Sequence, residues 1–428
     1  MAVVRPLRGI RFDTAHVDLG SALAPPYDVI SDALRTELYG RDLRNIVRID
    51  EGETYADDVT GSNDRYSRAR QHLDAWLVLG LLTQDEAPAL YVHDHTFTAE
   101  AGDRRTRRGL FVRVRALPWG ESDVLPHEHT LRGPREDRLR LMRATRAQTS
   151  APFLMWDRAP GLHAILDTAV EGARAETAET PGENGPEEHR LVVIDEPADI
   201  AAIVEALAGA RLYVADGHHR FETAAAYAQE RREAAPGTTA EDGSQWTLAY
   251  LCDAADPSLE VLPTHRVVRP AAGLPADGRA LAAKLPDGWS AESRPSLQAA
   301  LGEAAARRGE LHAVALVAPD GVQLLTTPRR TTAASPRDRL DVRVVQDDIL
   351  GTALGISPEQ ITAGALGYAR HAADAEAEVH AGTAAFALCL VGCTTAEIID
   401  VSDAGEQMPQ KSTYFHPKVP TGLVLAPL

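Results

Sequence analysis

The chain has 428 residues, 44% of them hydrophobic, and its 44 basic against 62 acidic residues give a formal net charge of −18. This length predicts two or three domains, and the acidic field excludes general binding to nucleic acid, although a local basic pocket for a small anion remains compatible with it. Three cysteines exclude a disulfide framework and a four-cysteine zinc site. The chain shows neither an apolar signal segment nor a run long enough to span a bilayer, so we predict a soluble, cytoplasmic protein without a membrane partner.

The N-terminal third predicts a rigid loop, two helices and a pair of strands. Residues 24–30 read APPYDVI, and the two consecutive prolines favour a stiff, extended backbone. Ser31 is a good N-cap for the helix that follows, and apolar residues recur at helical spacing over residues 64–82. Alternating polarity predicts two partnered strands at residues 89–97 and 109–117.

The middle of the chain predicts alternating helices and strands. A polar loop after residue 124 leads into a helix over about residues 135–146. The stretch 159–190 is rich in Ala, Glu, Gly and Pro and predicts one helix followed by a mobile loop around TPGENGPEE. Residues 191–216 then read as strand, helix and strand.

The Ala-, Pro- and Gly-rich stretch 270–300 predicts a domain boundary. Beyond it, the pattern predicts three strands and one helix, at residues 312–318, 321–326, 384–391 and 339–351. We therefore predict an α+β fold with a mixed sheet. The first domain spans residues 1–270, and the second is a smaller α/β region over residues 271–428.

The most informative motif is LYVADGHHRFETA, in which a β-branched run ends in Asp216 and Gly217 and an Ala-rich helix follows. A strand, a glycine turn and a helix place unpaired backbone N–H groups at the helix N-terminus, where they favour an anion. His218, His219 and Arg220 add donors at the same end. The motif therefore predicts a phosphate site; a tight turn with surface histidines is the alternative.

A second cluster, LPHEHTLRGPREDRLRLMRATRAQ, combines a polar loop with an arginine-rich helix. The loop holds His127, Glu128 and Thr130, and the arginines begin at Arg132 and include Arg143. Arginines can bind a phosphate or a carboxylate through two hydrogen bonds. We favour a functional role for the loop, whereas the helix reads more readily as a solvated surface with intrahelical ion pairs.

Two further loops hold residues suited to a binding site. The proline-rich loop fixes Tyr27 and Asp28 in a rigid segment, or else its aspartate simply caps a turn. Near the C-terminus, Lys411, Ser412 and Thr413 offer a cation and two hydroxyl groups, which suit phosphate contact but also occur in ordinary surface loops.

Histidine pairs raise the question of a metal. His93 with His95 and His127 with His129 are H-x-H pairs, and on a strand such a pair lies on one face. The chain lacks an HExxH motif, however, so we predict no resident metal site. Magnesium arriving with a nucleotide is favoured because it binds through phosphates and one or two carboxylates. The available carboxylates are those of Asp28, Glu128, Asp216 and Glu222.

These motifs occur together in one known family. The order RPLRGIRFD, APPYDVI, LPHEHTLRGPREDRLRLMRATRAQ, YVADGHHRFETA, LPTHRVV and MPQKSTYFHPK resembles the bacterial domain-of-unknown-function family one-thousand-fifteen. The resemblance covers nearly the whole chain, from about residue 3 to residue 428, and implies no particular reaction.

The strand–DGHHR–helix unit is also similar to the phosphate-binding unit of the ParB/sulfiredoxin-like superfamily, which includes sulfiredoxins, ParB proteins and free-serine kinases. This likeness covers about twenty residues. It implies that residues 1–270 form a mixed-sheet, ParB/sulfiredoxin-like nucleotide-binding core with insertions, and that the tail of the 271–428 region returns to its site. His218 occupies the position of the sulfiredoxin cysteine, so sulfinic-acid reduction would lack its nucleophile. The charge of −18 opposes a DNA-partitioning role.

The serine-kinase likeness implies phosphoryl transfer from ATP or ADP, with Mg²⁺, to the hydroxyl of a free amino acid such as serine. This interpretation assigns Glu128 and Asp28 as candidate bases, Glu128 preferred, with His219 as a third catalytic candidate. The expected nucleotide-binding residues are Asp216, Gly217, His218, His219, Arg220, Lys411, Ser412 and Thr413. The expected substrate-binding residues are Tyr27, His127, Thr130, Arg132 and Arg143.

Two rival functions also fit the motifs. A regulatory module would bind a nucleotide in the same GHHR cradle and would need no base. A metal-dependent hydrolase would use the histidine cluster instead. Nucleotide titration with an assay of phosphate transfer separates the first rival from the kinase, and elemental analysis of the purified protein separates the second.

Overall fold

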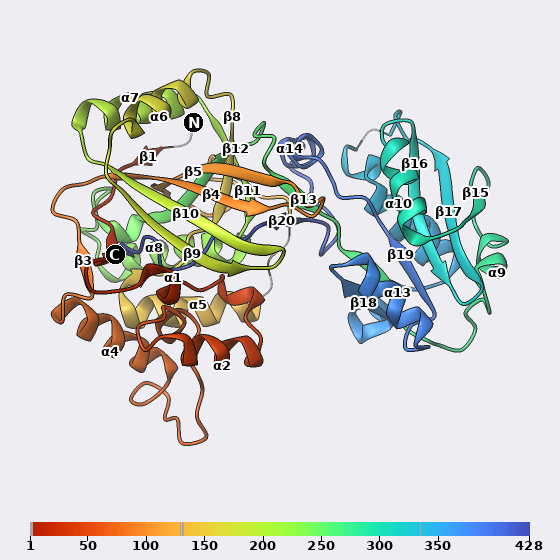
Figure 1. The fold of residues 1–428 in the computed structure, drawn as a ribbon, viewed down its shortest axis with the longest axis horizontal. Helices are drawn as coiled ribbons and strands as arrows, with labels where there is room; N and C mark the ends of the chain where they lie inside the picture. Colours follow the sequence, from red (N-terminus) through yellow and green to blue (C-terminus); the bar gives the residue numbers. More distant parts are fainter. Residues whose placement is uncertain (1–2, 129, 131, 334) are drawn as a thin grey trace. The chain divides into compact units, whose positions relative to one another are not determined.

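The computed structural model describes residues 3–428 except 129, 131 and 334, and the chain forms two compact units (Figure 1). The N-terminal unit comprises Met1–Glu260 together with Pro417–Leu428, and the C-terminal unit comprises Val261–His416. The two units divide near residue 260, and the last segment of the chain belongs to the N-terminal unit. The functional assignment of the two predicted domains, 1–270 and 271–428, stays a prediction.

The N-terminal unit is built on a mixed sheet with the strand order β6-β11-β8-β12-β5-β4-β10-β9, in which β1 also pairs with β5. Most neighbouring strands are antiparallel, but β6 runs parallel to β11 and β8 runs parallel to β12. The mixed α+β architecture predicted from the sequence is confirmed. The strands are β1 (Val4–Arg5), β4 (Leu90–Thr98), β5 (Arg104–Arg115), β6 (Val124–Leu125), β8 (Phe153–Asp157), β9 (Ala175–Gly182), β10 (Gly185–Ile194), β11 (Arg211–Asp216) and β12 (Trp246–Asp253).

Two further short strand pairs complete the N-terminal unit. Strand β2 (Ile10–Phe12) pairs with β3 (Leu82–Gln84), and β21 (Ala426–Pro427) pairs with β7 (Ala147–Gln148). The second pairing is antiparallel and joins the very end of the chain to the segment that follows α5. It fixes residues 417–428, and with them Lys418, to the N-terminal unit.

Helices cover both faces of this sheet. In Figure 1, α6 and α7 lie above the sheet and α4 and α5 lie below it, while α8 packs against α5 and β12. The core on the side of α6 and α7 is made by alternate strand residues such as Leu90, Val92 and Leu212, because successive side chains of a strand point to opposite faces. The helices are α1 (Leu19–Ala22), α2 (Asp32–Arg41), α3 (Val47–Asp50), α4 (Arg65–Val78), α5 (Arg132–Thr145), α6 (Leu162–Val170), α7 (Pro197–Leu207) and α8 (His218–Ala234).

Local sequence signals explain several of these boundaries. The side chain of Ser31 accepts a hydrogen bond from Leu34 N and caps α2 as predicted. Asp64 and Ser67 form a reciprocal capping box at the start of α4. The predicted strand pair is confirmed as β4 and β5, which are antiparallel, with Tyr91 opposite Phe111.

The predicted mobile loop around TPGENGPEE is wrong. Residues 175–194 form an antiparallel hairpin of β9 and β10, in which Gly182 pairs with Gly185. Side chains of β9 alternate between half-buried and exposed, so its apolar residues are too few to give a clear pattern. The Asn184–Gly185 dipeptide at the turn, which favours hairpins, was the available signal.

The C-terminal unit contains a second sheet with the strand order β15-β17-β16-β19-β14-β18. The strands predicted near residues 312–318, 321–326 and 384–391 are confirmed as β16, β17 and β19. The predicted helix near residues 339–351 begins as α11 and continues as a π-helix over Val345–Ala353. The strands are β14 (His265–Val268), β15 (Ser290–Arg294), β16 (Leu311–Ala318), β17 (Gly321–Pro328), β18 (Leu366–Ala369) and β19 (Phe386–Cys389).

Short helices and a small strand pair complete the C-terminal unit. Strand β13 (Glu260–Leu262) begins at the division between the units and pairs with β20 (Tyr414–His416). The helices are α9 (Gly278–Ala282), α10 (Leu297–Ala306), α11 (Asp341–Val344), α12 (Pro358–Gln360), α13 (Ala372–His380) and α14 (Thr395–Asp403). Among the residues that the structure describes, every helix is too short or too polar to cross a membrane.

Candidate functional site

The predicted strand–glycine–helix unit is present in the N-terminal unit. Strand β11 ends at Asp216, and α8 begins at His218 after the N-cap Gly217. Gly217 has a φ of 85°, a left-handed conformation that favours glycine. A Cβ atom at this position would also lie 2.6 Å from Nε of Arg220. The first backbone N–H groups of α8 have no partner within the helix, so this end of α8 favours an anion.

Two buried cations share the carboxylate of Asp216. Nη2 of Arg220 and Nζ of Lys418 each donate to it. Burial alone would raise the pKa of Asp216, but the charges of Lys418 and Arg220 hold it well below its ordinary value. Arg220 also donates to the Ala151 carbonyl at 2.5 Å. The beginning of α8 therefore carries two positive charges against one buried carboxylate.

The parallel pairing of β6 with β11 brings the histidine loop to the same place. Leu125 pairs with Tyr213, so both strands end at the same edge of the sheet. The backbone N–H of His127 donates to Nε2 of His218 at 3.3 Å, and the two rings meet edge to face with centroids 4.6 Å apart. Glu128 follows directly in the chain and is half-buried. The loop and the GHHR turn are thus neighbours, as the sequence interpretation required.

The proline-rich loop also approaches this group. Tyr27 stacks under the guanidinium of Arg138, whose Cζ lies 4.1 Å from the ring centroid. Burial raises the pKa of Tyr27 to about 12, against the opposing charges of Arg220 and Arg138. The carboxylate of Asp28 is exposed and lies close enough to Arg220 to raise the pKa of that arginine.

Arg138 is a second buried arginine close to this group, and the sequence did not predict it as a site residue. Arg138 of α5 bonds the backbone carbonyl of Asp50 at 2.7 Å, the Glu51 carboxylate at 2.7 Å and Asp137 at 2.6 Å. Asp50 accepts a hydrogen bond of 2.6 Å from Thr149. Burial raises the pKa of Asp50, while Arg138 and Thr149 act in the opposite direction.

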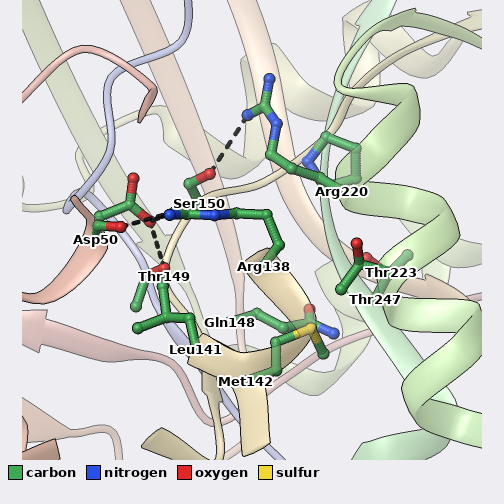
Figure 2. Close-up of a pocket in the computed structure, with 11 residues that line it drawn as sticks. Asp50, Arg138, Leu141, Met142, Gln148, Thr149, Ser150, Arg220, Thr223 and Thr247 are labelled. Atoms are coloured by element: carbon green, nitrogen blue, oxygen red, sulfur yellow. Dashed lines mark hydrogen bonds and ion pairs between the residues drawn. The ribbon is translucent and has the colours of Figure 1, made fainter. Parts of the chain in front are cut away.

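Arg138, Asp50 and Arg220 border a cavity of about 30 Å³, which Figure 2 shows in close-up. Figure 2 also shows Ser150 joined to Arg220, at 3.5 Å. A cavity of this size, lined by both polar and apolar side chains, has room for one or two water molecules and is too small for a nucleotide.

The next turn of α8 carries a further polar group. Thr130 donates to the Glu222 carboxylate, and Nη1 of Arg135 lies 3.7 Å from the same carboxylate. His219 is half-buried one turn earlier. Thr130 and His219 therefore belong to the group that the structure brings together around the beginning of α8.

Arg143 lies away from this group, and the places of four other predicted residues relative to it stay predictions. Arg143 pairs with Glu230 of α8 at 2.5 Å on the surface, eleven residues and thus about 16 Å along the helix from His219. Arg132 is the first residue of α5, but its side chain lies outside the described residues. Lys411, Ser412 and Thr413 belong to the C-terminal unit, and their assignment to the nucleotide site stays a prediction.

Sequence reasoning missed Lys418, Asp50 and Arg138. Lys418 follows Lys411 by seven residues in the same motif, but only the KST triplet has the composition typical of a phosphate-binding loop. Asp50 stands in no motif that the sequence analysis identified. No local signal in the sequence separates Arg138 from the other arginines of its helix, and its burial became visible only with the fold.

The buried His127 predicts a pH dependence of stability. Burial lowers its pKa to about 4, although a hydrogen bond to the Val214 backbone and the charge of Asp216 oppose this. The unfolded chain binds the proton near pH 6.5 and the folded chain only near pH 4. Stability therefore falls as the pH drops from 6.5 to 4, by on the order of 3 kcal/mol for this group. Urea unfolding at several pH values should show a smaller loss for His127→Gln.

A matched control for this experiment is the half-exposed His163, which pairs with Asp253. His163→Gln deletes an exposed imidazole outside the site and shows how much of any change comes from losing a histidine as such. Equal losses of stability in the wild type and in His127→Gln would contradict the assignment of a neutral, buried His127.

Comparisons with known proteins give one family match and several distant structural matches. The sequence matches the family described as "Protein of unknown function (DUF1015)" over residues 4–343. A comparison with curated proteins gives no match. Among solved structures, a conserved hypothetical protein from Pyrococcus furiosus is 15% identical, with a TM-score of 0.34 over 70% of this chain and 90% of that one.

Two further solved structures are similar at the same low level. A free serine kinase in complex with AMP is 14% identical, with a TM-score of 0.34 over 70% of this chain and 89% of that one. A C-terminally truncated SbnI from Staphylococcus aureus is 11% identical, with a TM-score of 0.31 over 70% and 82%. Because the family match spans well over half of the sequence, the chain belongs to the family of proteins of unknown function DUF1015.

Proposed function

We propose that this protein is a nucleotide-dependent small-molecule kinase that transfers a phosphoryl group to the hydroxyl of a free amino acid such as serine. We also propose that its N-terminal unit has a ParB/sulfiredoxin-like core. The supporting observation is the beginning of α8, where Gly217 is the N-cap and two cations, Arg220 and Lys418, share one carboxylate.

This arrangement suits a nucleotide phosphate chain. Backbone N–H groups at a helix N-terminus bind phosphate oxygens, and a lysine and an arginine neutralise the charge that develops during transfer. Lys418 can take the neutralising role that sequence reasoning gave to Lys411, since its ammonium already lies against Asp216. The half-buried His219 lies beside these groups on α8 and could donate to a phosphate oxygen.

The reaction also needs a base for the acceptor hydroxyl. In the proposed step, the hydroxyl oxygen attacks the terminal phosphorus, the bond to the bridging oxygen of the nucleotide breaks, and the hydroxyl proton passes to a carboxylate. Glu128 and Asp28 are the candidates, because both loops reach the beginning of α8. Products are the phosphorylated amino acid and the nucleotide shortened by one phosphate.

Magnesium fits this site only in part. Asp216 is held by two cations, so it is a poor ligand for Mg²⁺. The exposed carboxylate of Asp28 could supply one ligand while phosphates supply the others. When bound, the ion would neutralise phosphate charge, and the chain's own residues would still position the nucleotide and accept the proton.

The test is a transfer assay with labelled ATP and ADP against a panel of free amino acids, using the full chain. Glu128→Gln and Asp28→Asn are compared with Arg143→Gln, whose surface ion pair lies away from the site. We expect one of the two carboxylate variants to lose at least ~100-fold in kcat with unchanged nucleotide affinity, and Arg143→Gln to keep full activity.

Two results would contradict the proposal: the first concerns its catalytic function, and the second its assignment of the base. Nucleotide binding without transfer to any hydroxyl acceptor would favour a regulatory module. Full transfer activity in both carboxylate variants would remove Glu128 and Asp28 as the base.

A further inference from the structure

Three buried imidazoles gather on neighbouring strands of the N-terminal sheet, apart from the proposed kinase site. In the register of β4 and β10, His95 lies directly opposite His189. His93 and Glu187 are each two residues from one of this pair, so all four side chains lie on one face of the sheet. The ring centroids of His95 and His189 are 4.5 Å apart, and those of His93 and His189 are 5.3 Å apart.

These rings are deeply buried and lie against one another. His93 and His95 are 0% exposed and His189 is 2% exposed. Nε2 of His93 lies 3.1 Å from Nδ1 of His189, and among the described residues Nδ1 of His93 has no hydrogen-bond partner. Imidazole nitrogens gathered in this way are typical ligands of a metal ion.

We propose that His95, Glu187 and His189 bind a divalent transition-metal ion of the zinc class. One potential ligand atom from each residue lies within 4.8 Å of the others. Two imidazoles and a carboxylate are a common zinc ligand set, with metal–ligand distances of about 2.0–2.2 Å, and the fourth position stays open for water. Ligands around such an ion lie roughly 3.5 Å apart, so closing the site needs shifts of about 1 Å.

Arg107, which lies next to His95, determines which ring nitrogen of His95 carries the proton. Its Nη2 lies 3.2 Å from Nδ1 of His95, and because a guanidinium only donates, Nδ1 accepts. His95 therefore carries its proton on Nε2 and donates it to Glu187 at 2.8 Å. A metal ion at Nε2 releases this proton to solvent. The two imidazole ligands disfavour Mg²⁺ and Ca²⁺, which bind imidazole weakly, and favour ions that prefer nitrogen ligands. The positive charge of Arg107 opposes the binding of any divalent ion.

Solvent reaches this group at Glu187, and the Thr180 hydroxyl contacts the ring of His189. The side chain of Glu187 is 13% exposed, so the group is reachable from solvent at this side. The hydroxyl of Thr180 lies 2.8 Å from Nε2 of His189, and Nε2 of His93 lies 3.1 Å from its Nδ1. A metal ion that binds His189 displaces one of these two contacts, and the other holds the ring. Because β4 and β10 carry all the ligands, a bound ion would clamp two strands of the sheet and raise the stability of the N-terminal unit.

The test uses the full chain without an affinity tag, treated with a chelator and then titrated with Zn²⁺ by calorimetry and with Co²⁺ by visible absorption. We expect one ion per chain, d–d absorption bands with Co²⁺, and a higher melting temperature with either metal. Glu187→Gln should weaken binding at least ~10-fold. The control is Glu188→Gln, because Glu188 points to the opposite face, is mostly exposed and pairs with Arg104.

A second variant keeps the proposal testable if Glu187→Gln folds poorly. Arg107→Met removes the opposing charge and should tighten Zn²⁺ binding. Substoichiometric zinc, the absence of d–d bands, or equal losses in Glu187→Gln and Glu188→Gln would overturn the site. The three proposed ligands lie outside the proposed kinase machinery, so the Glu187→Gln result is independent of the transfer assay. Arg107 donates to the carbonyl of Pro417, the neighbour of Lys418, so Arg107→Met is used for metal binding alone.

Discussion

Replacing Lys418 by methionine should lower the rate of phosphoryl transfer by about 10²–10³-fold. The ammonium of Lys418 lies against the Asp216 carboxylate at the beginning of α8, where the proposed function places the phosphates. Methionine keeps most of the length of the side chain and removes its charge, so developing negative charge on the transferred group would lose one of its two cations. The rate is measured at saturating nucleotide and amino acid.

Two other lysines serve as controls for this prediction. Lys284→Met changes an exposed residue of the C-terminal unit and should leave the rate unchanged. Lys411→Met tests the assignment made from the sequence, in which Lys411 neutralises the transferred group. A large loss in Lys411→Met with full activity in Lys418→Met would contradict the neutralising role of Lys418.

Replacing Arg138 by methionine should lower the free energy of unfolding by about 3–5 kcal/mol. Arg138 is 6% exposed and is surrounded by Asp50, Glu51 and Asp137. Without the guanidinium, the buried Asp50 carboxylate loses the cation that bonds it and must be protonated or solvated at a cost. Urea unfolding at neutral pH measures the difference.

Arg143→Gln is the matched control from the same helix. Its side chain is 44% exposed and pairs with Glu230 and Glu136, and an exposed pair of this kind contributes roughly 0–1 kcal/mol. The double variant Asp50→Asn with Arg138→Met should recover part of the loss, because it removes the stranded charge. Equal effects of Arg138→Met and Arg143→Gln would show that the buried network contributes no more than a surface pair.

Local patterns predicted much of the fold. The strand pair β4 and β5, the strand–glycine–helix unit around Gly217, and the cap at Ser31 follow from alternation, glycine and capping chemistry that act within a few residues. The hairpin of β9 and β10 was missed because its outer strand is half-exposed and almost without apolar residues. Its stability comes from pairing with β4, which no local pattern reveals.

The site was predictable where one motif contains its chemistry and unpredictable where it depends on distant segments. Gly217, His218 and Arg220 are contiguous, and the parallel pairing of β6 with β11 brings His127 beside them. The partner of Asp216, in contrast, comes from Lys418, 202 residues later. Choosing Lys418 over Lys411 required knowing that the chain returns to the N-terminal unit at Pro417.

The histidine cluster also depends on segments that are distant from one another in the sequence. The H-x-H pattern of His93 and His95 predicted that both rings share a face of a strand, and the structure confirms this. The additional ligands come from β10, which lies largely within the stretch that the sequence did not identify as a strand. The metal proposal therefore depends on strand register between β4 and β10, a tertiary property.

Equilibrium titration of the full chain with ATP and ADP in the presence of Mg²⁺ decides whether the beginning of α8 binds a nucleotide through its phosphates. We expect saturable binding at one site in the wild type and in Arg143→Gln, with marked weakening in Lys418→Met. Failure to detect saturable binding of either nucleotide at millimolar concentrations, or equal affinity in all three proteins, would contradict a phosphate site at this end of α8.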